Sequence, residues 1–404
     1  MTRDAALVFA GRAARTFSLG ALSLVLPLLL AERGLGAAGL GAVLTATLVE
    51  DALITVAVTA LAPRWGRRRL LIVSALPMAL GGSVLAQARD TTWLLLAVVF
   101  AVVSANGLEA GPFSPLEQAT LADAVAAGGQ TRAFAWYNVV GYVPAALGAL
   151  AAGRWVHAAE AAGRASQAAL RSVVWVYVGG GVLLAILYSG LQADRPAPTR
   201  TAPGWLGLHR SRAVVAQLAG LQALDALAGG FVAQSLLVYW FFLRFGTGPD
   251  ALGRLFFGTQ LLSALSFLAA ARLAERVGLL HTMVFTHVLS NVLLACVALM
   301  PTFPLAAAVL LGRHLFSQMD VPTRQSYTMA LVDPDERAPA AGLTTAARGI
   351  AQAFSPALAG LALARAAFGA PFFLAGGLKI VYDLSLFARF RKVPLPAVDG
   401  RPPR

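Results

Sequence analysis

The chain contains a single cysteine, Cys296, among its 404 residues. One thiol cannot form an intramolecular disulfide, and it cannot by itself build the thiolate sites that hold structural zinc. Cofactor chemistry that depends on several cysteine ligands is therefore excluded. We expect neither a metal nor another cofactor.

Charged residues are also scarce. They make up 13% of the chain, whereas roughly 25% is typical of soluble domains, and 58% of the residues are hydrophobic, with a mean hydropathy of +0.71. An ordinary soluble protein is thus excluded, and the chain is predicted to lie in a membrane. A net charge of +13 would suggest nucleic acid in a soluble protein. Here the basic residues gather in turns on one side of the apolar segments, so no nucleic-acid partner is expected.

Several motifs that carry chemistry are absent from the sequence. It has no Gly-x-x-x-x-Gly-Lys-Ser/Thr loop for a nucleotide, no His-Glu-x-x-His zinc pair and no Gly-x-Ser-x-Gly nucleophile turn. Transport driven by ATP is not expected, and an intramembrane enzyme is only a minor alternative. No cleavable signal peptide is evident, because Arg12 and Arg15 interrupt the first apolar run.

Apolar segments long enough to cross a bilayer, about 20 residues each, are abundant. Twelve can be drawn, which predicts an all-α membrane protein. The first six are 6–30, 38–61, 69–88, 92–121, 132–153 and 172–191. The other six are 212–242, 251–272, 279–300, 303–331, 338–363 and 371–389.

The predicted spans divide the chain into two six-helix halves. The first half is 1–191 and the second is 212–390; a linker at 192–211, rich in Pro, Arg and Thr, joins them, and a basic tail occupies 391–404. One other connection, Gly153–Arg171, is expected to be long. The arginine-rich turns place the linker, the tail and both termini in the cytoplasm of a multi-pass protein of the bacterial inner membrane.

The two halves repeat one another at an offset of 210 to 212 residues. Helix-breaking positions then coincide, as Gly20 does with Gly230, while Arg15 stands opposite Asp225. Transporters are often built from two such repeats with the solute site between them. The agreement in glycine and the reversal in charge predict one asymmetric site on a symmetric scaffold.

The turn after the second span carries the clearest motif. Residues 59–68 read Thr-Ala-Leu-Ala-Pro-Arg-Trp-Gly-Arg-Arg, and residues 275–278 of the second half read Glu-Arg-Val-Gly. With twelve spans in two equivalent halves, this resembles the major facilitator superfamily, whose pattern here is Gly-x-x-x-Asp-Arg-x-Gly-Arg-Arg. Thr59 and Pro63 replace the leading Gly and the Asp. The resemblance implies the major facilitator fold and a cytoplasmic gate made of Arg64, Gly66, Arg67, Arg68, Glu275, Arg276 and Gly278.

Two further stretches bear on the branch of that family. The fragment Gly141-Tyr142-Val143-Pro144, with Gly148, is similar to part of the Gly- and Pro-rich antiporter motif of span five. The arginine that proton-coupled exporters carry in span four is absent, because Val103 stands there, and the equivalent position of the second half is Arg313. The resemblance is closest to the drug/proton antiporter branch and implies proton-linked export.

Ionisable residues within the predicted spans are the candidate functional residues, because a charge in lipid costs several kcal/mol unless it faces protein or water. In the family, spans one, four, seven and ten line the cavity. The charges in those spans are Arg12, Arg15, Glu109, Glu117, Asp225, Arg313, His314, Asp320 and Arg324; span two adds Glu50 and Asp51, and span eleven adds Arg348. Cations and acids nearly balance, which argues against a strongly charged solute.

Span ten holds the sharpest pattern. If 303–331 is one helix, with about 100° between residues, Arg313, Ser317, Asp320 and Arg324 share one stripe, which must avoid lipid. The predicted solute cavity consists of Arg15, Asn106, Glu109, Asp225, Arg313, Ser317, Asp320 and Arg324.

A carboxylate that is unpaired in one state of a transport cycle can carry a proton. The predicted coupling residues are Glu109, Asp51, Asp225 and Asp320. By contrast, Lys379 and Asp383 in span twelve are interpreted as a structural ion pair, since their i,i+4 spacing makes them neighbours.

These observations predict a monomeric secondary transporter that works by alternating access and exports a small organic solute in exchange for protons. Membrane lipids are its other expected partners. Two alternatives stay open at this point: proton-coupled uptake of a nutrient, and a transporter-like sensor that binds a ligand without flux.

Overall fold

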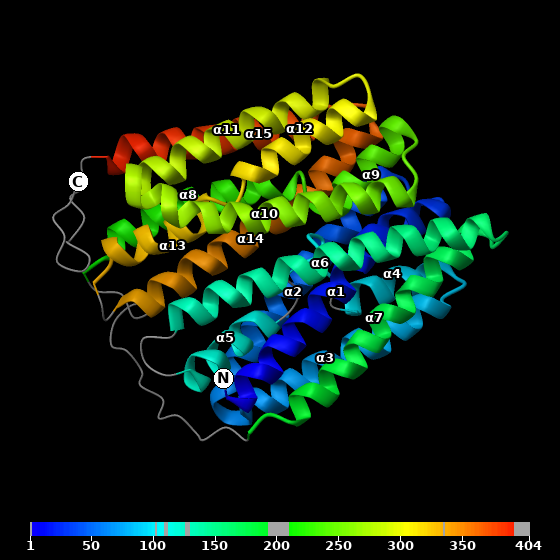
Figure 1. The fold of residues 1–404 in the computed structure, drawn as a ribbon, viewed down its shortest axis with the longest axis horizontal. Helices are drawn as coiled ribbons and strands as arrows, with labels where there is room; N and C mark the ends of the chain where they lie inside the picture. The colour runs from blue at the N-terminus through cyan, green and yellow to red at the C-terminus, as the bar shows by residue number, and fades with distance from the viewer. Residues whose placement is uncertain are drawn as a thin grey trace. The chain divides into compact units, whose positions relative to one another are not determined.

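A computed structural model describes residues 2–101, 103–108, 112–125, 130–192, 210–333 and 336–391. Over these ranges the chain forms fifteen α-helices and no β-strand (Figure 1). The predicted all-α class is therefore confirmed.

The helices follow the twelve predicted spans closely. The first seven are α1 (Arg3–Glu32), α2 (Ala37–Trp65), α3 (Arg67–Gln87), α4 (Thr91–Phe100), α5 (Phe113–Ala124), α6 (Gln130–Ala161) and α7 (Ser166–Ser189). The other eight are α8 (Arg212–Gly230), α9 (Gln234–Phe245), α10 (Pro249–Val277), α11 (Leu279–Leu299), α12 (Phe303–Phe316), α13 (Asp320–Leu331), α14 (Arg337–Ala364) and α15 (Ala370–Phe390). In the described part of the chain, nine helical stretches are long and apolar enough to cross a membrane.

Three predicted spans are each divided into two helices. Span four becomes α4 and α5, span seven becomes α8 and α9, and span ten becomes α12 and α13. The assumption that span ten is one continuous helix is therefore wrong. Proline explains the third break: Pro322 has no N–H to donate to the preceding turn, and it lies in the first turn of α13, where none is needed. Gly229 and Gly230 end α8, because glycine is a weak helix former.

The connection predicted at Gly153–Arg171 is also mostly helical. The helix α6 continues to Ala161 and α7 begins at Ser166, with Gly163 in the turn at φ 82°. The stretch is rich in alanine, the strongest helix former, which explains why the helices extend beyond the apolar segments.

The chain divides into two compact units by its internal contacts. The first comprises Met1–Thr199, Ala233–Leu261 and Leu363–Arg365, and the second comprises Arg200–Val232, Leu262–Ala362 and Ala366–Arg404. Residues 233–261, assigned by sequence to the second half, count here with the first unit. The predicted division into two six-helix halves follows the sequence repeat, and the units follow contacts, so the two divisions differ. The division into halves stays a prediction.

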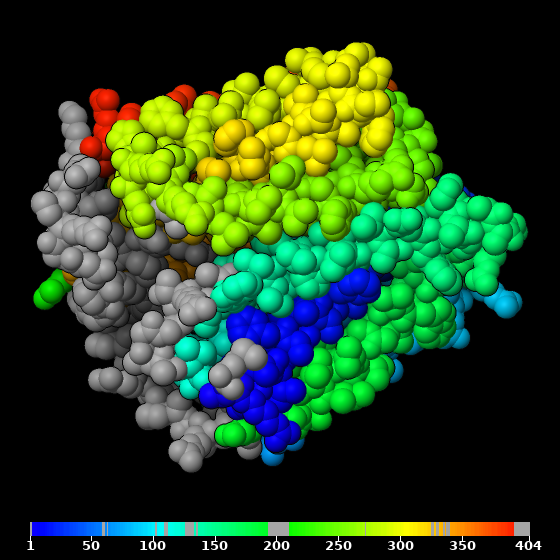
Figure 2. Space-filling model, viewed as in Figure 1, coloured from blue at the N-terminus to red at the C-terminus, as the bar shows by residue number. Residues whose placement is uncertain are grey.

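In the first unit, α1 packs against α6 and α7, and the blue surface of α1 borders both in Figure 2. Glycine permits the close approach of α6. A Cβ added at Gly20 would lie 2.2 Å from the carbonyl oxygen of Ala145, and one at Gly148 would lie 2.0 Å from that of Phe17. Such close packing holds helices together in lipid, where the hydrophobic effect gives no drive for association.

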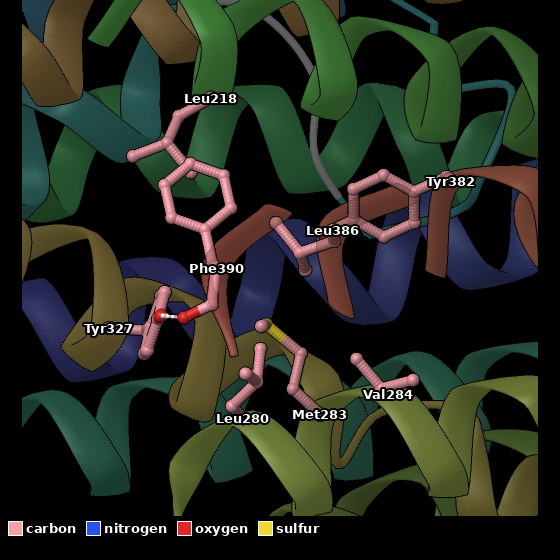
Figure 3. Close-up of a cluster of buried hydrophobic side chains, with 8 residues drawn as sticks. All are labelled: Leu218, Leu280, Met283, Val284, Tyr327, Tyr382, Leu386 and Phe390. Carbon is pink, nitrogen blue, oxygen red and sulfur yellow. Dashed lines mark hydrogen bonds between the residues drawn. The ribbon is translucent and has the colours of Figure 1, made fainter. Parts of the chain in front are cut away.

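The second unit uses the same device at equivalent positions. A Cβ added at Gly230, which is 210 residues after Gly20, would lie 2.7 Å from the carbonyl oxygen of Gln352 in α14. An apolar cluster joins α8, α11, α13 and α15, with Tyr327 donating to the carbonyl of Phe390 at 3.3 Å (Figure 3). Its buried members are Leu218, Leu280, Met283, Val284, Tyr327, Tyr382, Leu386 and Phe390. These four helices also carry the buried charged residues Asp225, Asp320, Arg324, Lys379 and Asp383.

Candidate functional site

The second unit holds a buried ionic network centred on Asp225 of α8. The Asp225 side chain is 3% exposed, and Lys379 Nζ lies 2.5 Å from its Oδ1. Arg348 Nη1 and Arg324 Nη1 lie 2.9 Å and 3.3 Å from its Oδ2. The three cations come from α15, α14 and α13. Because taking a charge out of water costs several kcal/mol, this convergence of partners is what makes a buried carboxylate tolerable.

A second acid joins the network through Arg324. Its Nη1 donates to Oδ2 of Asp320 at 2.6 Å, one turn earlier in α13. The i,i+4 spacing places both side chains on one side of the helix. Three of the predicted cavity residues, Asp225, Asp320 and Arg324, are therefore brought together.

The predicted ion pair between Lys379 and Asp383 is wrong. Lys379 bonds Asp225, whereas Asp383 is bonded by His287 Nδ1 at 2.8 Å and by Asn291 Nδ2 at 3.2 Å. The prediction considered only neighbours within one helix, and the partners on other helices compete better. His287 and Asn291 were missed by the sequence analysis, although two polar residues four apart in an otherwise apolar span are a usable signal.

The first unit holds a second buried network, centred on Glu117 of α5. Arg15 Nη2 of α1 lies 2.6 Å from Glu117 Oε2, and both side chains are 0% exposed. The same carboxylate accepts hydrogen bonds from the hydroxyls of Tyr137 in α6 and Tyr188 in α7. The guanidinium of Arg15 also lies 5.0 Å from the ring centroid of Phe113, which adds a cation–π contact. Both tyrosines were missed by the sequence analysis.

Arg12 lies beside this network. Its Nη1 donates to Ser114 Oγ at 3.0 Å and to the hydroxyl of Tyr137 at 3.3 Å, and its guanidinium stacks on that ring at 4.3 Å. A Cβ added at Gly141 would lie 2.7 Å from Arg12 Nη2. The glycine of the antiporter-like fragment thus makes the room that this arginine occupies.

The two networks occupy equivalent places in the repeat. Arg15 and Asp225 are 210 residues apart, and so are Ser114 and Arg324. In the first unit a cation on α1 holds an acid, and in the second an acid on α8 holds cations. The reversal of sign seen in the sequence therefore reappears in the contacts within each unit.

Arg313 makes its direct contacts elsewhere. Its Nη1 is 3.2 Å from His314 Nε2, and His314 Nδ1 is 2.9 Å from Ser263 Oγ of α10. Since Nε2 must accept from the guanidinium, Nδ1 carries the hydrogen and donates to the serine. The stripe predicted from Arg313 through Ser317 to Asp320 assumed one straight helix, and it is interrupted where α12 ends. Buried Ser317 donates weakly to the carbonyl of His314 at 3.5 Å.

Three predicted site residues remain: Asn106, Asp51 and Glu109. Asn106 is half-buried in the turn between α4 and α5, and Asp51 is half-buried in α2. Next to Asp51, both carboxylate oxygens of Glu50 are closed to solvent and have no hydrogen-bond partner among the residues that the structure describes. Glu109 lies outside those residues, so its role stays a prediction.

Both predicted gate turns are tight glycine turns. Gly66 has φ 80° and Gly278 has φ 86°, a conformation that side chains disfavour. The Gly66 amide donates to the carbonyl of Ala62, and the Gly278 amide donates to that of Ala274. The repeat is therefore reproduced in backbone geometry.

One ion pair ties the first of these turns to α5. Arg67 Nη2 lies 2.6 Å from Asp123 Oδ2, and the two side chains are 22% and 70% exposed. The remaining members of the predicted gate, Arg64, Arg68, Glu275 and Arg276, lie in or beside the same turns. A gating action of these groups stays a prediction.

In the described ranges, no group of three or more His, Cys, Asp or Glu side chains is arranged to hold a metal ion. Cys296 is half-buried and carries a free thiol.

Comparison with known proteins identifies relatives over most of the chain. The sequence profile of the family described as the Major Facilitator Superfamily matches residues 8–312. The "Uncharacterized membrane protein YJR124C" of Saccharomyces cerevisiae is 25% identical over 422 residues, which cover 96% of this chain and 94% of that protein.

Solved structures of similar fold include the nucleoside transporter NupG, with a TM-score of 0.73 at 12% identity, covering 97% of this chain and 100% of that one. A D-xylose-proton symporter matches with a TM-score of 0.73 at 12% identity, covering 99% and 98% of the two chains. A bacterial homolog of the human lysosomal transporter Spinster matches with a TM-score of 0.73 at 12% identity, covering 95% and 97%. At these identities the likeness concerns the fold alone.

Proposed function

The chain belongs to the Major Facilitator Superfamily of secondary transporters, and we propose that it exports a small organic solute in exchange for protons. Membership rests on a family profile that matches more than half of the chain, and similar solved structures confirm the predicted fold. The protein is accordingly a multi-pass membrane transporter and not an enzyme. The direction, the class of solute and the coupling ion are the proposal.

The observation that carries the proposal is the number of cations around one buried carboxylate. Ionised Asp225 links α8 to Arg324 of α13, Arg348 of α14 and Lys379 of α15. A proton on Asp225 would remove the charge that all three share. Two unit charges 4 Å apart interact by about 4 kcal/mol at an effective dielectric constant near 20. Protonation would therefore favour release of these links, which is the property required of a coupling site.

Contact with the solute is proposed for the groups at the accessible side of this network. The side chains of Arg348 and Arg324 are 29% and 11% exposed, whereas that of Asp225 is 3% exposed. A solute would meet guanidinium donors before it met the acid. Because the acids nearly balance the cations, an uncharged solute rich in carbonyl, hydroxyl or ether oxygens suits these donors best.

Beyond Arg348 and Arg324, solute contact stays proposed for the residues that the sequence singled out. In the first unit these are Arg15, Asn106 and Glu109, and in the second Asp225, Arg313, Ser317 and Asp320. Proton coupling is assigned first to Asp225 and Asp320, because both are buried beside Arg324. Asp51 and Glu109 are the further candidates.

The preference for export rests on the resemblance of span five to the antiporter motif. Gly141 and Gly148, from the fragment that is similar to the antiporter motif, lie against Arg12 and Phe17 of α1. Because these glycines lack side chains, α6 packs closely against α1, the helix that carries Arg12 and Arg15. Uptake together with protons would use the same parts, and it is the alternative that the experiment must separate.

We further propose a monomer in a bacterial plasma membrane with both termini in the cytoplasm. The arginine-rich turn around Gly66 supports this orientation, because basic loops are retained on the cytoplasmic side. Reporter fusions to each terminus, one type active only inside the cell and one only outside, would test the orientation.

Flux in inside-out vesicles tests the main proposal. Vesicles whose lumen is acidified are offered a panel of labelled neutral solutes, and accumulation inside that collapses with the proton gradient supports export. Expulsion of a preloaded solute by the same gradient would identify uptake in the cell. Binding without any flux or exchange would identify a sensor, and both of these results contradict the proposal.

Matched variants make the assay specific. Asp225→Asn and Arg324→Gln should abolish gradient-driven flux, because each removes one partner from the network. Arg254→Gln is the control: Arg254 forms an ion pair with Asp250 at 2.5 Å, but on the surface of α10, with its side chain 65% exposed. Its flux should match that of the unmodified protein at equal protein density.

A further inference from the structure

His287 of α11 lies between two carboxylates. Its Nδ1 is 2.8 Å from Oδ1 of Asp383 in α15, and its Nε2 is 3.8 Å from Oδ1 of Asp225 in α8. All three side chains are at most 4% exposed. The helices α11 and α15 correspond to spans nine and twelve, which supply none of the solute contacts proposed above. A charged seam between them needs another explanation.

The spacing of residues on both helices builds this seam. His287 and Asn291 are four apart on α11, and both contact Asp383. Lys379 and Asp383 are four apart on α15, so one reaches Asp225 and the other reaches His287. The two helices approach closely at Gly376, where a Cβ would lie 2.9 Å from the carbonyl oxygen of Asn291.

The two ring nitrogens of His287 have different roles. An ionised carboxylate only accepts hydrogen bonds, so Nδ1 carries a hydrogen and donates it to Asp383. In the neutral ring, the lone pair of Nε2 then faces the Asp225 carboxylate, which is unfavourable. A proton on Nε2 turns this into an attraction, and a movement of about 1 Å would complete a hydrogen bond.

We propose that Nε2 of His287 is a proton-binding site of this transporter, with Asp383 as the residue that positions the ring. Binding converts the neutral imidazole to an imidazolium by addition of one proton from water, and no other bond is formed or broken. The role of that proton in transport rests on the function proposed above, whereas its binding does not.

Proton binding has a structural consequence, because two donors would then share one oxygen. Lys379 Nζ donates to the same Oδ1 of Asp225 that Nε2 of His287 faces, while Arg324 and Arg348 hold Oδ2. An imidazolium at this oxygen repels the ammonium group of Lys379, which weakens the link between α8 and α15. A proton bound by His287 on α11 thus alters the contact between α8 and α15.

The remaining groups around the ring are consistent with this switch. Tyr382 packs its ring edge-on against His287, with centroids 6.1 Å apart and planes at 85°, which restrains the orientation of the imidazole. Asp320 binds Arg324 at 2.6 Å. Among the residues that the structure describes, Asp225 and Asp383 are the acids in contact with the imidazole, one at each nitrogen.

Nuclear magnetic resonance of the purified protein in lipid nanodiscs tests the site without any solute. The chain has five histidines and only two lysines, Lys379 and Lys392, so selective ¹⁵N labelling yields spectra that single variants can assign. On acidification, Nε2 of His287 should gain a proton while Nδ1 keeps its own. The Nζ signal of Lys379 should shift over the same pH interval.

Three variants separate a switch from a merely structural histidine. In His287→Gln, the pH dependence of the Lys379 signal should be lost. In Asp383→Asn, which serves if the first variant does not fold, the histidine should show both neutral tautomers because its fixed acceptor is weakened. His281→Gln is the control. His281 is on the same helix but stacks on Phe285 and meets the ring of Phe387 edge-on, so the Lys379 signal should titrate unchanged.

Two results would overturn the site. One is a His287 ring that does not gain a second proton on acidification, and the other is a Lys379 titration that persists unchanged in His287→Gln. Failure of the proposed function has a different signature: both titrations are present, yet a proton gradient drives no solute in the vesicle assay.

Discussion

The buried pair of Arg15 and Glu117 allows a prediction whose magnitude follows from burial alone. Glu117→Gln removes the negative charge but keeps the shape of the side chain. Arg15 is 0% exposed, so its guanidinium loses the carboxylate at 2.6 Å and gains no water in exchange. Breaking a buried pair in this way costs about 3–5 kcal/mol. The hydroxyls of Tyr137 and Tyr188 donate to different oxygens of Glu117, and the amide of glutamine has only one acceptor oxygen. One of these two hydrogen bonds is therefore lost as well, in keeping with a destabilisation of this size.

A surface ion pair of the same length separates the effect of burial on stability from the effect of geometry. Arg67 and Asp123 are also 2.6 Å apart and also join two helices, but their side chains are 22% and 70% exposed. Exposed pairs contribute about 0–1 kcal/mol, since water solvates both partners when the pair is broken. Asp123→Asn should therefore lower the free energy of unfolding by less than about 1 kcal/mol.

Reversible unfolding in mixed micelles, followed by tryptophan fluorescence, measures both losses. A double-mutant cycle with Arg15→Gln and Glu117→Gln adds a sharper test. The double variant buries two neutral amides and should be more stable than Glu117→Gln alone, with a coupling of about 3 kcal/mol. The reasoning is refuted if Glu117→Gln costs no more than Asp123→Asn, or if the double variant is no more stable than the single one.

Asp320→Asn should reduce transport more than expression, because Arg324 keeps Asp225 as a partner at 3.3 Å; equal flux per purified protein would contradict a role for Asp320 in transport. Gly148→Ala should lower the yield of folded protein, because its Cβ would lie 2.0 Å from the carbonyl oxygen of Phe17. Gly179→Ala is the control and should be tolerated, because the space around Gly179 is open. Size-exclusion chromatography measures both yields. Asp90 caps α4, and its pKa is lowered chiefly because the amide of Thr92 donates to its carboxylate. Its stabilisation of that helix end is therefore present at neutral pH and lost as the pH falls through the lowered pKa. Corrected amide exchange of Thr92 and Trp93 should accelerate in that acid range, and Asp90→Ala should exchange fast at every pH.

The sequence was a good guide to the course of the helices and a partial guide to the site. Twelve apolar segments predicted all fifteen helices in position, because span length is a local property of composition. The breaks in spans seven and ten escaped, since a pair of glycines or Pro322 permits a break in a helix without requiring one. Among the site residues, Asp225, Asp320 and Arg324 were found because charge in an apolar span is conspicuous.

The partners of those charges were harder to predict. Lys379 had an acid four residues away on its own helix, yet it bonds Asp225, 154 residues earlier. Tyr137 and Tyr188 are ordinary residues in apolar helices, and only the carboxylate of Glu117 makes them notable. Nothing in the local pattern distinguishes a tyrosine that packs from one that clamps an acid.

Composition and periodicity alone thus determined that this chain is a membrane protein of apolar helices, duplicated, with glycine turns at 66 and 278 and a few charges that lipid would not tolerate. Tertiary structure decided which of those charges meet. The reason is physical: insertion of a helix depends on its own residues, whereas the free energy of a buried ion depends on every donor and acceptor that other helices bring within about 3 Å.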